Sequence, residues 1–168
     1  STVAQIAGEK CGIIKPGSAV ISSNEQLPEA AQVILQAAAQ KNNRLILANT
    51  KEMSKVTVTP FGSSFCYRGL TLKINLPGRH QLFNAAQSVE AALYLGLPKA
   101  AIVNGLAAAQ FPCRLEVLQK EPLILIDGAH NPDGAETLAA YLKEFNLRPA
   151  AVVGMMADKD CARVLQTV

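Results

Sequence analysis

A carboxylate and an imidazole stand three residues apart in the segment IDGAHNPD, at residues 126–133. Asp127 and His130 are side chains that can contact a ribose, neutralise a phosphate or move a proton. An ordinary helix start explains the same residues without any chemistry, because Asn131 is a favourable N-cap and Pro132 suits the first helical position. The motif by itself leaves both a phosphate-binding loop and a capped turn with two solvated side chains open.

The elements around this motif decide where its side chains would lie. The apolar run at residues 122–126 predicts a buried strand, and a helix is expected to begin at Pro132 after a short loop. Strand, loop and helix make one βα unit, and open parallel sheets bind ligands at the carboxyl ends of their strands. Asp127 and His130 are therefore predicted at an edge that binds a nucleotide or a phosphate.

Lysine and amide side chains mark two more candidate sites. Lys10 ends a predicted helix and is followed by CGIIKPG, where a solvated lysine that suits the helix dipole is the ordinary explanation. Gln81 and Asn84 lie in GRHQLFNAA, where a loop enters a helix. Their amides suit the polar edge of a purine, and helix capping explains them equally well.

Charged residues near two other predicted strands complete the set. Arg114 in FPCRLE opens a strand just after Pro112, where its guanidinium would bind a phosphate bidentately or pair with a nearby carboxylate. Lys159 stands in the triplet DKD at residues 158–160, which by itself is typical of a solvated loop. We expect Asp158 and Asp160 to be structural.

Composition limits the class of protein. The 168 residues carry 16 Lys and Arg against 13 Asp and Glu, a net charge of +3, with no Trp and 5% aromatic residues, so nucleic-acid binding is disfavoured. The four cysteines lie far apart without a CxxC pair, which argues against zinc and disulfides and favours a reduced, cytoplasmic protein. Since no apolar run approaches the ~18–20 residues of a membrane span, we expect no membrane partner.

Hydrophobic periodicity predicts alternating helices and strands with one antiparallel insert. Helices are predicted at residues 2–10, 28–40, 82–93, 102–109 and 132–145, and from residue 160 onward. Strands are predicted at residues 19–21, 44–48, 115–118, 123–126 and 150–154, and a small antiparallel meander at residues 55–76. We place a domain boundary at Pro112, which gives domains at residues 1–112 and 113–168.

Five segments, in this order, resemble the folylpolyglutamate synthase/dihydrofolate synthase family of the Mur ligase superfamily. They are IAGEKCGIIKPG at residues 6–17, GRHQLFNAA at 78–86, PCRLE at 112–116, DGAHNP at 127–132 and GMMADKD at 154–160. The resemblance implies an α/β protein that consists of the end of a Mur-ligase-like P-loop ATPase domain, with the small meander, and the start of a Rossmann-like C-terminal domain.

The resemblance also implies an activity, an ATP-dependent amide ligase that adds L-glutamate to a folate or to dihydropteroate through an acyl phosphate. It further implies a cytoplasmic enzyme that is a monomer at full length. Lys10 matches a lysine that is carbamylated in the family and serves a Mg²⁺ site. This chemistry needs a neutral amine, and therefore a buried lysine, and it yields the hard oxygen ligand that magnesium prefers.

The other family roles fall on the ATP site. The adenine contacts match Gln81 and Asn84, and the phosphate-binding arginine matches Arg114. Asp127 matches a residue near the ribose, and His130 an imidazole near the γ-phosphate and the acyl-transfer centre. Lys159 would add a positive charge.

The sequence departs from the family in three places. No GxxxxGK[ST] phosphate loop occurs, Cys113 stands where glycine is common, and Phe111 replaces the usual tryptophan. We therefore expect a piece of a longer protein that is inactive alone. A peptidoglycan-type Mur ligase and a non-catalytic nucleotide-binding fragment stay open as alternatives. A dinucleotide-dependent oxidoreductase is disfavoured because no GxGxxG follows a predicted strand.

Overall fold

The computed structural model describes residues 2–156 and 159–168. Contacts divide the chain into two compact units, Ser1–Met53 with Phe83–Ile102 and Ser54–Leu82 with Val103–Val168. The chain passes from one unit to the other inside α3 (His80–Tyr94) and again inside α4 (Lys99–Ala108). The boundary that we place at Pro112 stays a prediction.

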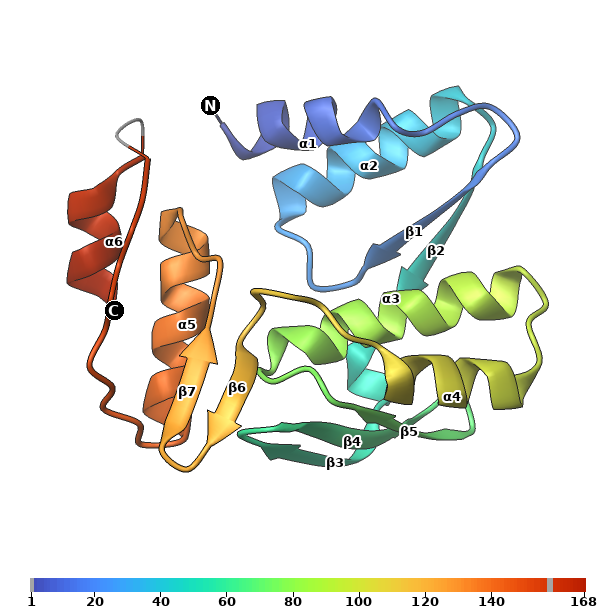
Figure 1. Ribbon diagram of the computed structural model, residues 1–168. Coiled ribbons are helices and arrows are strands. Elements are labelled where there is room, and N and C mark those ends of the chain that lie inside the picture. The colour runs from blue at the N-terminus through green and yellow to red at the C-terminus, as the bar shows by residue number, and fades with distance from the viewer. Residues whose placement is uncertain (1, 157–158) are drawn as a thin grey trace. The chain divides into compact units, whose positions relative to one another are not determined.

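A βαβ arrangement forms the first unit. β1 (Ala19–Ser23) and β2 (Arg44–Ala48) pair in parallel, and α2 (Pro28–Gln40) connects them (Figure 1). Pro28 occupies the first turn of α2, where its missing N–H costs no hydrogen bond. The two strands and the helix lie where the sequence predicts them.

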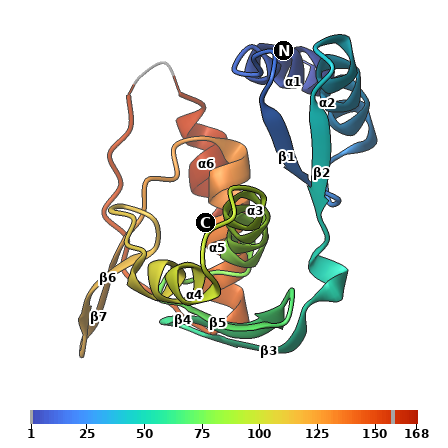
Figure 2. The ribbon, with the colours of Figure 1, turned by 90° about the vertical axis from the view of Figure 1, so that its right-hand side faces the viewer.

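The first unit also contains two short elements, α1 (Val3–Cys11) and η1 (Thr50–Glu52), in addition to most of α3. α1 lies beside α2 in both ribbon views (Figures 1 and 2), and η1 follows β2. Thr2 begins α1 with a reciprocal cap, because its Oγ1 accepts from the Gln5 N–H and the Gln5 side chain accepts from the Thr2 N–H. Lys10 lies in the last turn of this helix.

The predicted antiparallel meander opens the second unit. β3 (Ser54–Thr59), β4 (Gly62–Tyr67) and β5 (Leu70–Ile74) pair in sequence order. Alternate side chains along β4 and β5 are buried, as a sheet with one core face requires. Gly62 has a φ of +140°, and a Cβ there would overlap the Ile74 carbonyl, so glycine is needed at this turn.

The C-terminal part of the second unit contains a hairpin and two helices. β6 (Glu116–Lys120) and β7 (Leu123–Ile126) pair in antiparallel fashion, and α5 (Pro132–Glu144) packs beside α6 (Cys161–Thr167) (Figure 1). The helices at residues 132–145 and from residue 160 are confirmed. Each begins at a side-chain cap: Asn131 Oδ1 accepts from the Gly134 N–H, and Asp160 Oδ1 from the Arg163 N–H.

Buried side chains from the hairpin side and from α5 form one core in this part. Leu115, Tyr141 and Leu142 are buried together, with Leu125 and Phe145 packed against them. This core holds the start of β6 against the helix that follows the DGAHNP motif.

The strand predicted at residues 123–126 is confirmed as β7, whereas its predicted setting and the strand predicted at residues 150–154 are wrong. The run at residues 122–126 is not a buried strand of a parallel sheet, because only two residues separate β6 from β7 and so short a connection allows only antiparallel pairing. Ile124 and Ile126 have 43% and 40% of their surface exposed to solvent. Residues 150–154 form no strand, since they pair with no strand among the described residues, and Val152 is fully exposed.

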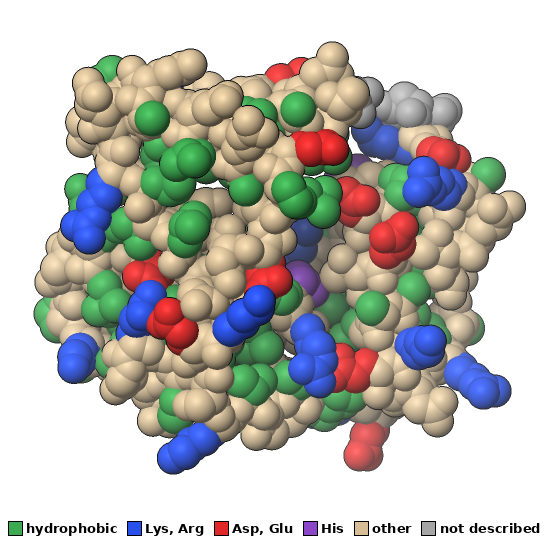
Figure 3. All heavy atoms as spheres, turned by 180° about the vertical axis from the view of Figure 1, so that it is seen from behind, with side chains coloured by type: hydrophobic (Ala, Val, Ile, Leu, Met, Phe, Trp, Pro, Cys, Tyr) green, Lys and Arg blue, Asp and Glu red, His purple; other side chains and the backbone are tan. Residues whose placement is uncertain are grey.

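The α/β class with a small antiparallel meander is confirmed. None of the helices in the described residues is both long enough and apolar enough to cross a membrane. Cationic and anionic side chains are interspersed on the face shown in Figure 3, without a broad region of one sign.

Candidate functional site

Asp127 joins two loops of the second unit. Its Oδ2 accepts a hydrogen bond from the Leu115 N–H at 2.8 Å, and its Oδ1 accepts one from the Ala129 N–H at 2.8 Å. The Gly128 N–H donates to the Cys113 carbonyl at 2.7 Å. The loop that precedes β6 and the loop that follows β7 are thus held side by side, and we call this set of hydrogen bonds the Asp127 clamp.

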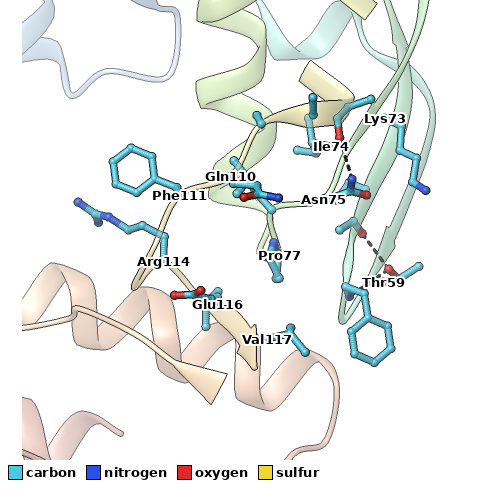
Figure 4. A pocket seen from close by; sticks show the side chains of 18 of the residues that line it. Thr59, Lys73, Ile74, Asn75, Pro77, Gln110, Phe111, Arg114, Glu116 and Val117 are labelled. Atoms are coloured by element: carbon cyan, nitrogen blue, oxygen red, sulfur yellow. Dashed lines mark hydrogen bonds between the residues drawn. The ribbon is translucent and has the colours of Figure 1, made fainter. Parts of the chain in front are cut away.

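An unusual backbone presents Arg114 at this clamp. Cys113 and Leu115 have φ values of +59° and +48°, a left-handed conformation that is strained for residues with a side chain. The Leu115 side chain is buried in the core, whereas Arg114 is exposed. The Arg114 guanidinium lies 5.6 Å from the centre of the Phe111 ring, and both side chains extend away from Thr59 and Lys73 (Figure 4).

His130 lies in the loop on the other side of the clamp. Its Nδ1 is 2.8 Å from the Gly128 carbonyl oxygen. A carbonyl only accepts, so Nδ1 carries the proton and donates, and Nε2 of this exposed ring is the atom left for a ligand. An Nε2 that donates to a phosphate oxygen must then belong to the doubly protonated ring.

His80 belongs to the same neighbourhood and was not among the predicted site residues. It is the first residue of α3, is partly buried, and interacts electrostatically with Asp127 and Arg114. Burial lowers the pKa of His80, the Asp127 carboxylate opposes this, and the Arg114 guanidinium adds to it. The signal in the sequence is its place directly before Gln81, in a chain with two histidines.

The two amides of the GRHQLFNAA motif lie about one turn apart on α3. Gln81 is buried, with 6% of its surface exposed, and its Nε2 is 3.0 Å from His80 Nε2. Asn84 is exposed. Neither residue is a side-chain N-cap, since Gln81 and Asn84 stand inside the helix, so capping does not explain them.

The two lysines differ in their surroundings. Lys10 is exposed, so the expectation of a buried lysine is wrong for the described chain: the end of α1 leaves its amine in solvent. Lys159 is partly buried in the bend before α6. Asp158 lies outside the described residues, and Asp160 has the structural role that we expect, as the cap of α6.

A groove of about 850 Å³ borders the site. It lies in the second unit between β3–β5, the segment after α4, and β6, and Arg114 is one of its lining residues (Figure 4). Asp127 and His130 do not line it. Leu115, whose N–H belongs to the clamp, also lines the groove. The motif residues form the better candidate for the site because they carry the acid and the imidazole.

Comparison with known proteins places these residues in a family. Residues 113–168 match the Mur ligase, glutamate ligase domain. Folylpolyglutamate synthase of Lacticaseibacillus casei is 35% identical over 96% of this chain and 40% of its own length. Dihydrofolate synthase/folylpolyglutamate synthase of Bacillus subtilis is 34% identical over 95% of this chain and 40% of its own length.

A solved structure agrees with these relatives. An FPGS–AMPPCP–folate complex superposes with a TM-score of 0.83 at 31% identity, and the match covers 99% of this chain and 43% of that one. The chain thus spans about two fifths of the length of the relatives that it matches. Over nearly its whole length the chain is thus similar to proteins of the folylpolyglutamate synthase/dihydrofolate synthase family, and its residues 113–168 match the glutamate ligase domain of the Mur ligases.

Proposed function

We propose that this chain is part of an ATP-dependent ligase that forms an amide between a folate carboxylate and L-glutamate. A carboxylate oxygen of a folate or of dihydropteroate attacks the γ-phosphorus of ATP, so an O–P bond forms and the bond to the ADP oxygen breaks. The amino nitrogen of glutamate then attacks the acyl carbon. The C–N bond forms, the C–O bond to phosphate breaks, and the nitrogen releases a proton.

The Asp127 clamp is the observation that carries this proposal. It holds Arg114 and His130, a guanidinium and an imidazole, on two adjacent loops through backbone hydrogen bonds to one carboxylate. Phosphoryl transfer is catalysed mainly by positioning and by neutralising charge on phosphate oxygens, and these are the side chains that do so. A guanidinium and an imidazole carried on two loops that are held together therefore fit the reacting end of a nucleotide.

Each side chain has a distinct task in this proposal. Arg114 binds phosphate oxygens through the N–H donors of its planar guanidinium group. His130 donates from Nε2, in its doubly protonated form, to the transferring phosphoryl group or to the tetrahedral intermediate. Asp127 both closes the clamp and, through its remaining lone pairs, accepts from a ribose hydroxyl, while Lys159 adds positive charge.

The adenine end of the proposed site lies on α3. Gln81 and Asn84 offer amide donors and acceptors for the polar edge of the base. The FPGS–AMPPCP–folate complex supports a nucleotide and a folate as ligands of a relative. We extend both to the protein that contains this chain, as a cytoplasmic monomer.

Lys10 is the residue that the family resemblance connects with magnesium. Among the described residues no three His, Cys, Asp or Glu side chains are placed to hold a metal ion. A carbamate on Lys10 would supply one hard oxygen, so the described donors do not make a magnesium site and no step is assigned to the metal. A mass increase of one carbon dioxide on Lys10, found by native mass spectrometry of the complete gene product, tests this modification.

The ligase activity is tested with the complete gene product. It is incubated with ATP, magnesium, L-glutamate and either a reduced folate or dihydropteroate, and phosphate release is measured beside the mass of the folate product. We expect one glutamate added per phosphate released, and a loss of kcat by orders of magnitude in R114A and H130A with unchanged thermal unfolding. The 168-residue chain alone is expected to show no turnover.

The acceptor decides between this function and its main alternative. A peptidoglycan-type ligase would add its amino acid to a uridine-nucleotide-linked peptide and leave folates untouched. Turnover with that acceptor and none with folates would replace the proposal. Nucleotide binding without turnover on either acceptor would favour the non-catalytic alternative.

A further inference from the structure

The His80 ring lies in close contact with the backbone of Gly78 at the start of α3. Gly78 has a φ of +92°, and a Cβ at this position would lie 2.6 Å from Cε1 of the His80 ring and 2.8 Å from its Nδ1. The same Cβ would lie 3.0 Å from Cδ1 of Leu115. The backbone of Gly78 is therefore in close contact with both the imidazole and the leucine, and a side chain at Gly78 would displace one of them.

The hydrogen bond to Gln81 fixes the state of the imidazole. Gln81 Nε2 lies 3.0 Å from His80 Nε2, and an amide nitrogen only donates. His80 Nε2 must then accept, which requires a neutral ring with its proton on Nδ1. A protonated ring has no acceptor atom, so protonation breaks this bond or turns the Gln81 carboxamide over.

Four other charged groups lie around this part of the helix. Asp127 in the loop after β7 and Arg114 in the loop before β6 interact with His80 with opposite signs. On the helix side, Arg79 forms an ion pair with Glu144 of α5 at 2.8 Å. A proton on His80 would add a second positive charge near Arg114, the proposed phosphate ligand, and Asp127 is the carboxylate that acts against it.

We propose that His80 is a positioning residue of the nucleotide site, whose neutral imidazole orients the Gln81 carboxamide and packs through Gly78 against the loop that presents Arg114. The proposal rests on the proposed function, because Gln81 and Arg114 contact the two ends of ATP only there. In this proposal His80 keeps Gln81, which binds the base, aligned with Arg114, which binds the phosphates. Protonation of His80 weakens ATP binding by releasing Gln81 and repelling Arg114.

The matched variants are H80Q and H80A. A glutamine carries an amide oxygen close to the place of the histidine Nε2, so H80Q keeps an acceptor for Gln81 that does not titrate, whereas H80A removes it.

We expect the wild-type KM for ATP to rise several-fold between pH 7.5 and pH 5.5, with a smaller change in kcat. H80A should have a KM about five- to tenfold above the wild-type value at pH 7.5, as the loss of one hydrogen bond predicts, and this KM should not rise further at pH 5.5. H80Q should stay within about threefold of the wild type at pH 7.5 and lose the extra acid dependence.

R79A is the control for disturbance of the helix start. Arg79 is exposed and its ion pair with Glu144 is at the surface, so the variant should leave the KM for ATP and its pH profile unchanged. An unchanged KM in H80A, or the same acid dependence in H80Q as in the wild type, overturns the proposal.

A second measurement does not depend on turnover. The sequence has two histidines, so ring ¹⁵N spectra of the 168-residue chain and of H130N assign His80 directly. We expect the Nδ1–H form at pH 7.5, and a return to the more common Nε2–H form in Q81L. An Nε2–H ring in the wild type contradicts the role of His80. If the complete gene product adds no glutamate to folates while this tautomer is found, the proposed function fails and the His80–Gln81 interaction stands.

Discussion

The Leu115 backbone N–H donates to Asp127 Oδ2 at 2.8 Å, across eleven intervening residues of hairpin. Leu115 is buried in the core and Asp127 is partly buried, so this bond connects the hydrophobic packing of the second unit to its polar loops. Arg114 precedes one partner and His130 follows the other. The two proposed phosphate ligands thus depend on a residue that need not touch the phosphate itself.

Removal of the Asp127 carboxylate should therefore cost both stability and activity. D127A loses two hydrogen bonds to a charged acceptor, each worth about 1.5–3 kcal/mol, so we expect a loss of about 3–6 kcal/mol in the free energy of unfolding. D127N keeps an oxygen that can accept one of the two bonds, and it should lose about half as much. Urea unfolding followed by circular dichroism measures both.

Turnover separates the two roles of Asp127. In the complete gene product, D127N should lower kcat more than its stability loss explains, because Arg114 and His130 lose their common support. Equal stability of D127A and the wild type would show that the clamp does not hold the loops.

The left-handed backbone at Cys113 is strained. A φ of +59° costs a residue with a side chain about 1–2 kcal/mol that glycine does not pay. Glycine loses about 0.5–1 kcal/mol more entropy on folding, so C113G should raise the unfolding free energy by about 0.5–1 kcal/mol.

C113S is the control for the loss of the thiol. Serine has nearly the same shape and meets the same backbone cost, so C113S should stay within about 0.5 kcal/mol of the wild type. A C113G protein that is less stable than C113S would show that this turn carries no strain.

The sequence predicts local elements of the site well and its long-range bonds poorly. Asn131 and Pro132 fix the start of α5 because a cap needs only residues within one turn. The pairing of β6 with β7 was missed because a continuous apolar run is compatible with both parallel and antiparallel neighbours. The two-residue connection at Glu121 and Pro122 carries the information that decides between them.

The hydrogen bonds of the Asp127 clamp could not be predicted from the sequence either. It depends on two positive φ values at Cys113 and Leu115, residues that seldom adopt them, and neither residue type signals such a loop. His80 was missed because its partners Asp127 and Arg114 lie more than thirty positions away. Lys10 was expected to be buried from its proposed chemistry, and no local pattern demanded it.

The lowered pKa of His80 predicts how stability changes with pH. The folded pKa lies below the ordinary value of 6.5, so between the two values the unfolded chain binds more protons than the folded one. The contribution of His80 is complete above pH 6.5, and it is lost as the pH falls from 6.5 through the lowered folded pKa. H80Q removes this contribution.

The difference between the wild type and H80Q isolates the effect from the carboxylates. We expect the unfolding free energy of the wild type, relative to H80Q, to be constant above about pH 7 and to decrease on acidification below 6.5. Urea unfolding at half-unit pH intervals measures it. A difference that is flat with pH, or that grows on acidification, would contradict a lowered pKa.

Tyr141 gives a test of the core that supports the clamp. Its ring is 2% exposed and contacts Phe145 edge to face, with 5.1 Å between ring centres, and its hydroxyl donates to the Pro60 carbonyl at 2.9 Å. Y141F keeps the ring and removes this one hydrogen bond, so it should lower the unfolding free energy by about 1 kcal/mol. Y141A also removes the buried ring and should cost about 3–5 kcal/mol.

Burial raises the pKa of Tyr141, so the folded state resists its ionisation, and the wild type should lose stability relative to Y141F as the pH rises above 10. Thermal unfolding between pH 8 and pH 10.5 measures this difference, and a Y141F protein as alkali-sensitive as the wild type would show that the hydroxyl ionises freely in the folded state.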